Sequence, residues 1–543
     1  PKRFIMTATL IRNANIYVQR GRFEEALLVE DGFITAIGTN EEIAARAPAD
    51  AEVFDAQGRT IVPGFNDSHQ HLFNTGIALT DIRLHKATSI REVKEIARRY
   101  IEERRPAPGT VLHGMGWNQD YFTDEARLLT RADLDDITTE YPLIFERACG
   151  HMLTANTAAL ERAGITRDTV VPEGGSIGHD ENGELNGIFA ENARGPLTAL
   201  FRNRSAEDCA ELIRTGMRHA AETGVTSVQT CDLREGTWRT VLEAYNRVMA
   251  DNPVTRVSHQ AYFSKPEEYR EFLAEGHVTK SGTPFHRFGP LKLFVDGSLG
   301  ARTAYMREPY HDAPETRGIS TLTPEQLDAL VGTAVEHHCG VAIHAIGDAA
   351  VEEVLDAYDR VCTDGMNPNR LGIIHVQITD RPLVERFTKN HILALVQPIF
   401  LHYDTTIVED RVGKDLAATS YAFGTMKKLG IHMSFGTDSP IEDMNPIDNL
   451  YCAVTRSNLK GEPAGGFHPE ECLDIYDAVD AYTTESAYAT FEEDIKGRLL
   501  PGYYADLVVL SENIFEMPKT ELRRTKVDAT MVGGRFVFMR EGA

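Results

Sequence analysis

Short apolar segments alternate with helical patterns through the middle of the chain. Eight of these segments read as strands, namely residues 60–66, 225–230, 254–262, 290–296, 340–345, 371–376, 391–397 and 431–437. Most are separated by stretches with helical periodicity, such as 206–222, which Ser205 can cap and which ends at Gly224. Eight strands with intervening helices predict an α/β fold of the (β/α)8 TIM-barrel type. A doubly wound open sheet is the alternative, but no glycine fingerprint follows the first strand.

Both ends of the chain show short strands and turns instead. Residues 8–55 include a hairpin around Asp31-Gly32, and residues 505–510 and 529–538 are strand-like near the other end. Each set is too small to be stable alone. We therefore predict one small β-sandwich built from both chain termini, residues 1–60 and 491–543, with the barrel at 61–490 between them.

The interval between the first and second predicted barrel strands, residues 72–224, is far longer than one crossover needs. We predict an inserted subdomain at about 74–200, over the mouth of the barrel, where a long insertion often shapes a pocket or lid. A peripheral elaboration without substrate contact is the alternative.

The first candidate chemistry lies in residues 64–71, which follow the apolar run 60–63. His69 and His71 have the same parity, so on a strand they point to the same side. Two neutral imidazoles at that separation can bind one divalent metal. Asp67 shares their parity and is suited to orienting a ligand. An ordinary pair of surface histidines is the alternative.

Polar residues at the ends of four later strands add to this pair. They are Lys292 with Asp296, His344, His375 and Asp438. The carboxyl ends of barrel strands meet at one rim. Taken singly, each has a structural explanation, such as a hydrogen-bonded histidine, a salt bridge or a turn cap. Burying so many ionisable groups together is costly without a cation, so the set predicts a metal site.

The composition limits the binding partners and the cellular location that we expect. The chain has 543 residues, 42% of them hydrophobic, and a net charge of −25, which disfavours nucleic acid and anionic membranes as partners. No apolar run reaches the ~18–20 residues of a membrane span, and residues 1–6 lack the apolar core of a signal peptide. The seven cysteines are scattered without a C-x-x-C pair, which fits a reducing compartment. We expect a cytoplasmic protein.

Ordered motifs over nearly the whole length resemble those of one enzyme superfamily. They are 63–72 (PGFNDSHQHL), Gly150-His151 with Asn156, 292–300 (KLFVDGSLG), 344–348 (HAIGD), 375–377 (HVQ), 397–398 (QP), 436–440 (GTDSP) and 500–508 (LPGYYADLV). With these motifs the chain is similar to the amidohydrolase superfamily (amidohydrolase family 3). Within it, the chain resembles the branch of YtcJ-like hydrolases and N-substituted formamide deformylase.

The resemblance implies a metal-dependent hydrolase barrel flanked by a β-sandwich. It implies that His69 and His71 bind a first metal, that His344 and His375 bind a second, and that Asp438 contacts the first metal and the attacking water. In many relatives the lysine that Lys292 matches carries CO₂ as a carbamate bridging both ions. Without that bridge the site holds one metal. Zinc is the expected ion, and a homodimer is a family-level expectation.

These assignments predict hydrolysis of a carbon–nitrogen bond in a small amide, such as an N-substituted formamide, by metal-activated hydroxide. Asp438 takes the proton of the attacking water and returns it to the leaving nitrogen. Predicted substrate contacts are His151, Gln397, Trp117, Tyr121 and Phe122. The alternatives are a single-metal deaminase or cyclic-amide hydrolase on the same fold, and a non-catalytic barrel scaffold.

Overall fold

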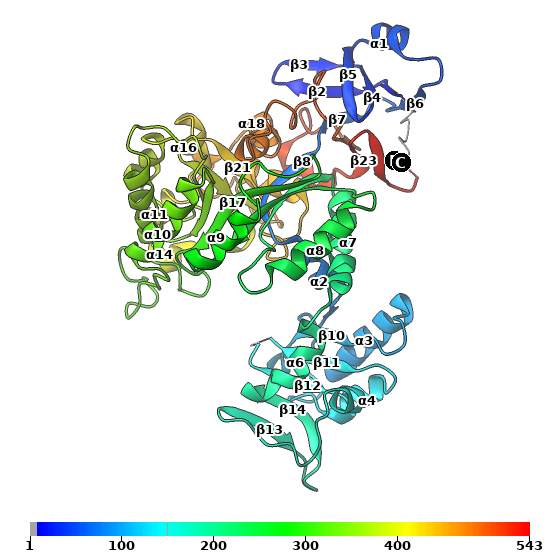
Figure 1. The fold of residues 1–543 in the computed structure, drawn as a ribbon, viewed down its shortest axis with the longest axis vertical. Helices are drawn as coiled ribbons and strands as arrows, with labels where there is room; N and C mark the ends of the chain where they lie inside the picture. Colours follow the sequence, from blue (N-terminus) through cyan, green and yellow to red (C-terminus); the bar gives the residue numbers. More distant parts are fainter. Residues whose placement is uncertain (1–7, 149, 543) are drawn as a thin grey trace. The chain divides into compact units, whose positions relative to one another are not determined.

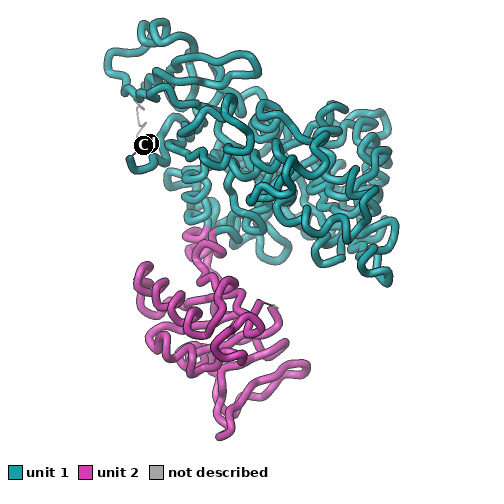
Figure 2. The backbone as a smooth tube through the Cα atoms, turned by 180° about the vertical axis from the view of Figure 1, so that it is seen from behind, with its two compact units in different colours: residues 1–75, 213–543 teal, residues 76–212 magenta. Residues whose placement is uncertain are grey.

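The structure is a computed structural model that describes residues 8–148 and 150–542. Cys149 and the first seven residues, on which part of the composition argument rests, lie outside the described residues. The chain divides into two compact units, one of residues 1–75 with 213–543 and one of residues 76–212 (Figure 2). Across the described residues, no helix combines the length and apolarity needed to cross a membrane.

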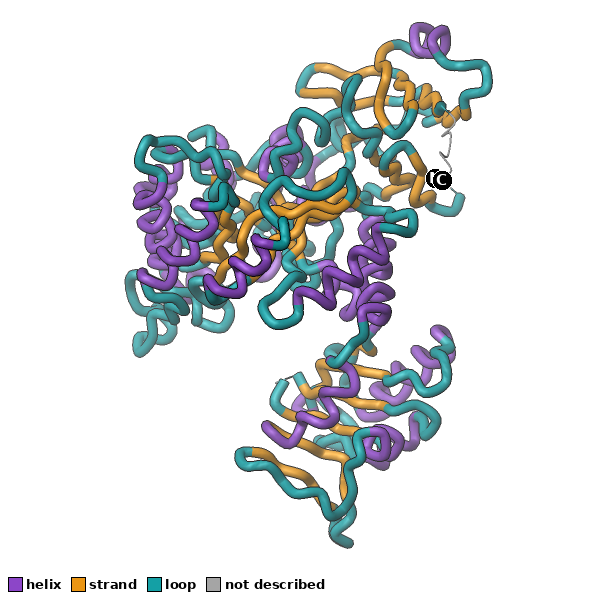
Figure 3. Tube along the Cα trace, viewed as in Figure 1, coloured by secondary structure: helices purple, strands orange, loops and turns teal. Residues whose placement is uncertain are grey.

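An eight-stranded parallel sheet forms a barrel in the larger unit (Figures 1 and 3). In order, its strands are β8 (Phe65–Gln70), β15 (Val225–Thr230), β16 (Arg256–Tyr262), β17 (His286–Phe294), β18 (Val341–Ala345), β19 (Gly372–His375), β20 (Leu393–Val396) and β21 (Met433–Phe435). The ring closes after β21, where the Asp438 N–H donates to the His69 carbonyl and the His71 N–H to the Ser439 carbonyl, both at 2.8 Å. The predicted (β/α)8 barrel is confirmed.

Helices connect these strands and bury apolar faces. In α11, Val351, Val354, Leu355 and Tyr358 are buried at helical spacing. The helix α10 begins with a capping box formed by Thr323 and Gln326. The main barrel helices are α7 (Ala206–Glu222), α8 (Trp238–Met249), α9 (Pro266–Ala274), α10 (Pro324–Glu336), α11 (Asp348–Val361), α12 (Arg381–Glu385), α16 (Phe423–Lys428) and α17 (Pro446–Thr455). Shorter helices are α1 (Asn40–Arg46), α2 (Leu72–Thr80), α13 (Leu401–Asp404), α14 (Val408–Val412), α15 (Lys414–Ala418), α18 (Ile475–Ala481) and α19 (Thr484–Ala489).

The first predicted strand, residues 60–66, is two strands in different sheets. Thr60–Pro63 is β7 of the sandwich, and the barrel strand β8 starts at Phe65. Gly64 separates them, because a Cβ added there would lie 2.0 Å from Thr226 Oγ1. The metal-site motif therefore sits at the end of β8, one strand later than the apolar run suggested.

Both chain ends build the sandwich. One sheet has the order β5-β4-β1-β6, with β1 (Thr9–Arg12), β4 (Ala26–Glu30), β5 (Phe33–Gly38) and β6 (Glu52–Asp55). The other has the order β24-β23-β22-β7-β2-β3, with β2 (Asn15–Gln19), β3 (Arg22–Glu24), β22 (Leu507–Leu510), β23 (Val527–Val532) and β24 (Arg535–Met539). Since β7 pairs with both β2 and β22, the two ends meet in one sheet. The predicted sandwich from both termini is confirmed.

A buried ion pair joins barrel and sandwich within this unit. Arg256 Nε and Nη2 donate to Asp506 Oδ2 and Oδ1 at 2.6 and 3.0 Å, and both side chains are almost fully buried. Replacing Asp506 with alanine is expected to lower the free energy of unfolding by about 3–5 kcal/mol, because it leaves Arg256 buried and unpaired. Urea denaturation measures this.

The matched control is Asp328→Ala, which removes the partner of Arg360 from an exposed pair. This change is expected to cost less than about 1 kcal/mol. Equal losses in both variants would contradict the structural role given to the buried pair.

The smaller unit holds one six-stranded sheet in the order β13-β14-β12-β11-β10-β9. Its strands are β9 (Ile82–Arg83), β10 (Leu112–Trp117), β11 (Leu143–Arg147), β12 (Met152–Ala155), β13 (Gly175–His179) and β14 (Leu185–Glu191), with helices α3 (Ile90–Arg104), α4 (Arg131–Ile137), α5 (Thr157–Arg162) and α6 (Gly195–Arg202). This unit of residues 76–212 follows the first barrel strand, as predicted for the insertion. Its predicted place over the barrel mouth stays a prediction.

Candidate metal centre

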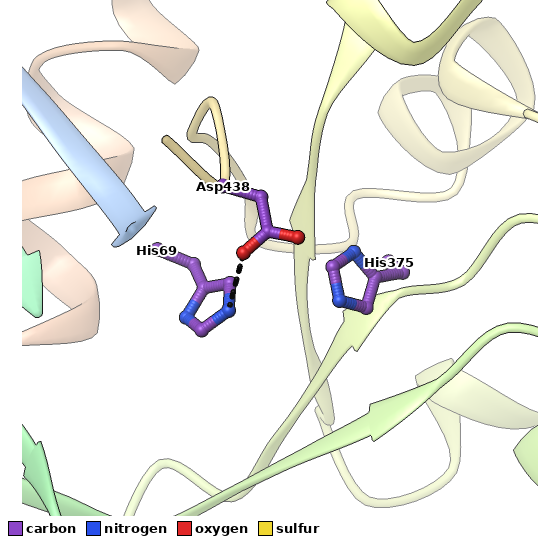
Figure 4. A group of neighbouring side chains, drawn as sticks. All are labelled: His69, His375 and Asp438. Atoms are coloured by element: carbon purple, nitrogen blue, oxygen red, sulfur yellow. Dashed lines mark ion pairs between the residues drawn. The ribbon is translucent and has the colours of Figure 1, made fainter. Parts of the chain in front are cut away.

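Three side chains that lie far apart in the sequence meet at the carboxyl end of the barrel. His69 is the penultimate residue of β8, His375 ends β19 and Asp438 follows β21. One ligand atom from each lies within 4.8 Å of the others, and all three residues are buried. Figure 4 shows the Asp438 carboxylate between the two imidazoles. Strand ends of a parallel barrel converge in this way.

Two glutamines fix the orientation of the histidines. Gln260 donates through Nε2 to the Ser68 carbonyl at 2.9 Å, which leaves its Oε1 facing His69 Nδ1 at 2.6 Å. Gln397 likewise donates to the Leu395 carbonyl, and its Oε1 lies 2.6 Å from His375 Nδ1. An amide oxygen only accepts, so Nδ1 of each imidazole carries the proton. Each Nε2 is then a lone-pair donor.

Both imidazoles are held neutral. Burial, followed by the nearby Lys292, lowers the pKa of His69 to about 3. Burial and the neighbouring His344 also lower the pKa of His375 well below its ordinary value. Neutral imidazole is the form that binds metal.

The lone pair of His69 faces a carboxylate. His69 Nε2 lies 3.2 Å from Asp438 Oδ1. Burial alone would raise the pKa of Asp438, but the hydrogen bond from the protonated His71 holds it well below the ordinary value, so the group is an anion. Two acceptors this close and buried are unfavourable unless a cation lies between them. The donor set therefore fits a divalent ion.

His71 approaches the same carboxylate, with its Nε2 3.1 Å from Asp438 Oδ1 and its Nδ1 3.2 Å from the Cys231 carbonyl. Burial lowers its pKa, but these two hydrogen bonds outweigh burial and raise it to about 10. Unlike His69, this imidazole is protonated when no metal is bound.

Asp67 connects the first and last barrel strands beneath the site. Its Oδ2 accepts from Thr437 Oγ1 at 2.5 Å, and its Oδ1 accepts from the backbone N–H groups of Thr437 and His69 at 3.1 and 3.2 Å. The side chain is fully buried. Asp67 thus fixes the backbone beside two donors, His69 and Asp438.

Lys292 and His344 lie next to the three donors. The Lys292 Nζ is buried 3.5 Å from His69 Nε2, and burial lowers its pKa to about 8. The His344 Nε2 lies 2.8 Å from the Gly297 carbonyl and 3.3 Å from Asp296 Oδ1, so it is already hydrogen-bonded outside the group. Asp296 in turn accepts backbone N–H groups of residues 305, 346 and 347.

Four predicted substrate contacts belong to the smaller unit. Trp117 and Phe122 are buried in its apolar core, and the Trp117 indole donates to the Phe145 carbonyl. Tyr121 is 64% exposed. His151 is exposed, with its Nδ1 3.2 Å from Glu191 Oε2. Their predicted contacts with substrate stay predictions, as does that of Gln397, which here binds His375.

A cavity of about 540 Å³ opens beside the donors and is lined in part by His344, His375 and Asp438. It lies wholly within the larger unit. A small-molecule site of this volume is typical of enzymes.

The sequence matches the model of the amidohydrolase family over residues 52–538. The chain belongs to this family. The amidohydrolase is 32% identical over 523 residues to "Putative amidohydrolase YtcJ" of Bacillus subtilis, covering 96% of this chain and 97% of the relative. It is 26% identical to "N-substituted formamide deformylase" of Arthrobacter pascens, covering 99% of each.

Solved structures agree with this assignment. The amidohydrolase superposes with a TM-score of 0.77 on an uncharacterized metal-dependent hydrolase from Pyrococcus horikoshii, at 28% identity, with 94% of this chain and 99% of the other covered. Family and site geometry together make this amidohydrolase a metal-dependent hydrolase that uses a divalent ion.

Metal binding to this amidohydrolase is expected to release protons. With a pKa of about 10, His71 is protonated at pH 7 and its Nε2–H faces Asp438 Oδ1, so an ion bound by that oxygen competes with this proton and displaces it. Zinc affinity should therefore rise with pH, by up to about tenfold per pH unit for one proton. Calorimetric titration with Zn²⁺ in buffers of different ionisation enthalpy measures the release. A heat that is independent of the buffer would contradict it.

Proposed function

We propose that the enzyme hydrolyses a carbon–nitrogen amide bond of a small molecule, with N-substituted formamides as the substrate class. The observation that carries the proposal is the Asp438 carboxylate facing the lone pair of neutral His69 at the edge of a 540 Å³ cavity. Similarity to N-substituted formamide deformylase over 99% of both chains supports the choice of substrate class.

His69, His375 and Asp438 would hold the ion, for which we propose zinc. A divalent ion there would act as a Lewis acid and would lower the pKa of a water molecule toward neutral pH. The residues of the chain do the rest. Asp438 accepts the proton of the attacking water and passes it to the leaving nitrogen, which would otherwise depart as a strongly basic amide anion. Gln260 and Gln397 keep both imidazoles oriented while this happens.

One ion is the arrangement that the three-donor group supports, since His344 is hydrogen-bonded elsewhere. Two ions, with His344 and a carbamate on Lys292, are the alternative. The one-ion arrangement also favours a second candidate function, a single-metal deaminase or cyclic-amide hydrolase. Elemental analysis of the purified protein distinguishes one ion from two.

A substrate panel tests the reaction. The zinc-loaded protein is incubated with N-alkylformamides, cyclic amides and amino-substituted heterocycles, and formate, ring-opened acid and ammonia are measured. Formate from the formamides is the expected result. Ammonia release alone would favour the deaminase, and ring opening alone the cyclic-amide hydrolase. No product from any class would contradict the proposed reaction.

We propose a small-molecule amide as the binding partner, and we propose neither nucleic acid nor a membrane as a partner. The cytoplasmic location and the homodimer stay predictions.

A further inference from the structure

The cavity beside the donors has an apolar wall and an acceptor wall. Leu299, Ile346, Phe400, Tyr403 and Ile441 form the apolar part. Gln377, Asp404 and Glu442 add polar groups beyond the metal site. Among the described residues that line it, none is lysine or arginine. Beyond the metal site, the described lining of the cavity therefore has the carboxylates of Asp404 and Glu442 without a lysine or arginine to balance them.

Gln377 leaves one acceptor open. Its Nε2 donates to Asp404 Oδ2 at 2.6 Å and to the Tyr421 hydroxyl at 3.0 Å. The Tyr421 hydroxyl also donates to Asp404 Oδ2 at 2.6 Å. Gln377 is 4% exposed, and within the described part of the chain its Oε1 accepts no side-chain or backbone hydrogen bond. A buried acceptor in a cavity wall is satisfied by a ligand that donates.

Glu442 lines the same cavity as Asp438 and follows it closely in the sequence. The turn that carries it is closed by the Ile441 N–H, which donates to the Asp438 carbonyl at 2.9 Å. Among the described residues Glu442 has neither a hydrogen bond nor an ion pair from its side chain. Burial and then Asp404 raise its pKa to about 7. A cation in the cavity would relieve this unfavourable burial of negative charge.

We propose that the cavity selects amides that carry an ammonium group, which Glu442 and Asp404 bind while Gln377 Oε1 accepts one of its hydrogen bonds. The apolar wall contacts the hydrocarbon between the ammonium group and the amide. This selectivity rests on the proposed amide hydrolysis, and it adds the charge of the substrate to that proposal.

Three formamides of matched length test it: N-(4-aminobutyl)formamide, N-pentylformamide and N-(3-carboxypropyl)formamide, which are cationic, neutral and anionic at pH 7.5. With the zinc-loaded wild-type enzyme, kcat/KM is expected to be highest for the cationic compound and lowest for the anionic one. In Glu442→Gln, kcat/KM for the cationic compound should fall about tenfold, and that for the neutral compound should stay within about twofold.

The control is Glu409→Gln, which removes one exposed carboxylate outside the cavity and should leave the ratio unchanged. Should Glu442→Gln unfold, Asp404→Asn and the wild-type ranking test the same prediction. Calorimetric binding of the three compounds to the metal-depleted full chain measures selectivity without turnover. This binding test therefore decides the inference even if no compound is hydrolysed. Absence of hydrolysis would overturn only the proposed reaction.

Equal binding of the three compounds would overturn the inference. So would a preference for the anion, which would instead point to Arg234 and Lys265 in a separate cavity of about 530 Å³.

Discussion

Replacing Asp438 with asparagine is expected to lower kcat by about 10³-fold or more without loss of the fold. Asparagine has nearly the same shape, but it cannot accept the proton of water or return it to the leaving nitrogen. Asp438 is buried, and its Oδ1 lies 3.2 and 3.1 Å from the Nε2 atoms of His69 and His71. Steady-state kinetics with an N-alkylformamide measure the loss, and circular dichroism confirms folding.

Asp415→Asn provides the matched control, since this carboxylate is exposed on α15 and outside the cavity. Its activity should stay within about twofold of wild type. If Asp438→Asn kept a tenth or more of wild-type kcat, Asp438 would not be the proton acceptor.

Replacing His69 with alanine is expected to weaken zinc binding by more than about 100-fold and to remove activity with it. Loss of a residue that only orients a metal ligand already lowers metal affinity by about 10–100-fold. His69 is proposed to bind the ion itself, so its loss should cost more. Its Nδ1 partner Gln260 would remain in place. Zinc content after dialysis against a weak chelator, measured by elemental analysis, reports the change.

His311→Ala is the control, because His311 is exposed and lies outside the donor group. Wild-type zinc content in His69→Ala, together with wild-type activity, would show that the imidazole of His69 is not a ligand.

The barrel was predictable because most of its strands are short apolar runs, and several of these end at or precede a polar residue such as His375 or Gln397. The same apolar pattern also led to an error, because one strand was predicted where the structure has two. Residues 61–65 contain no polar side chain, yet Gly64 divides them between two sheets because Thr226 leaves no room for a Cβ. A packing restriction from a residue so distant in sequence leaves no local signal.

The donors were predictable for the same reason, as polar groups at strand ends, but their arrangement was not. His375 and Asp438 have φ angles of 81° and 56°, a conformation unusual outside glycine, and these angles cannot be read from the residue type. Gln260 is one of several polar residues in the predicted strand 254–262, so the sequence does not distinguish it as a partner of a metal ligand. That it binds His69, 191 residues away, depends on the tertiary fold.

The most direct test of the central claim is a crystal structure of the zinc-loaded protein with anomalous diffraction at the zinc edge. We expect a strong peak bound by His69 Nε2, His375 and Asp438. A fully loaded, active enzyme with no peak among these three side chains would contradict the account.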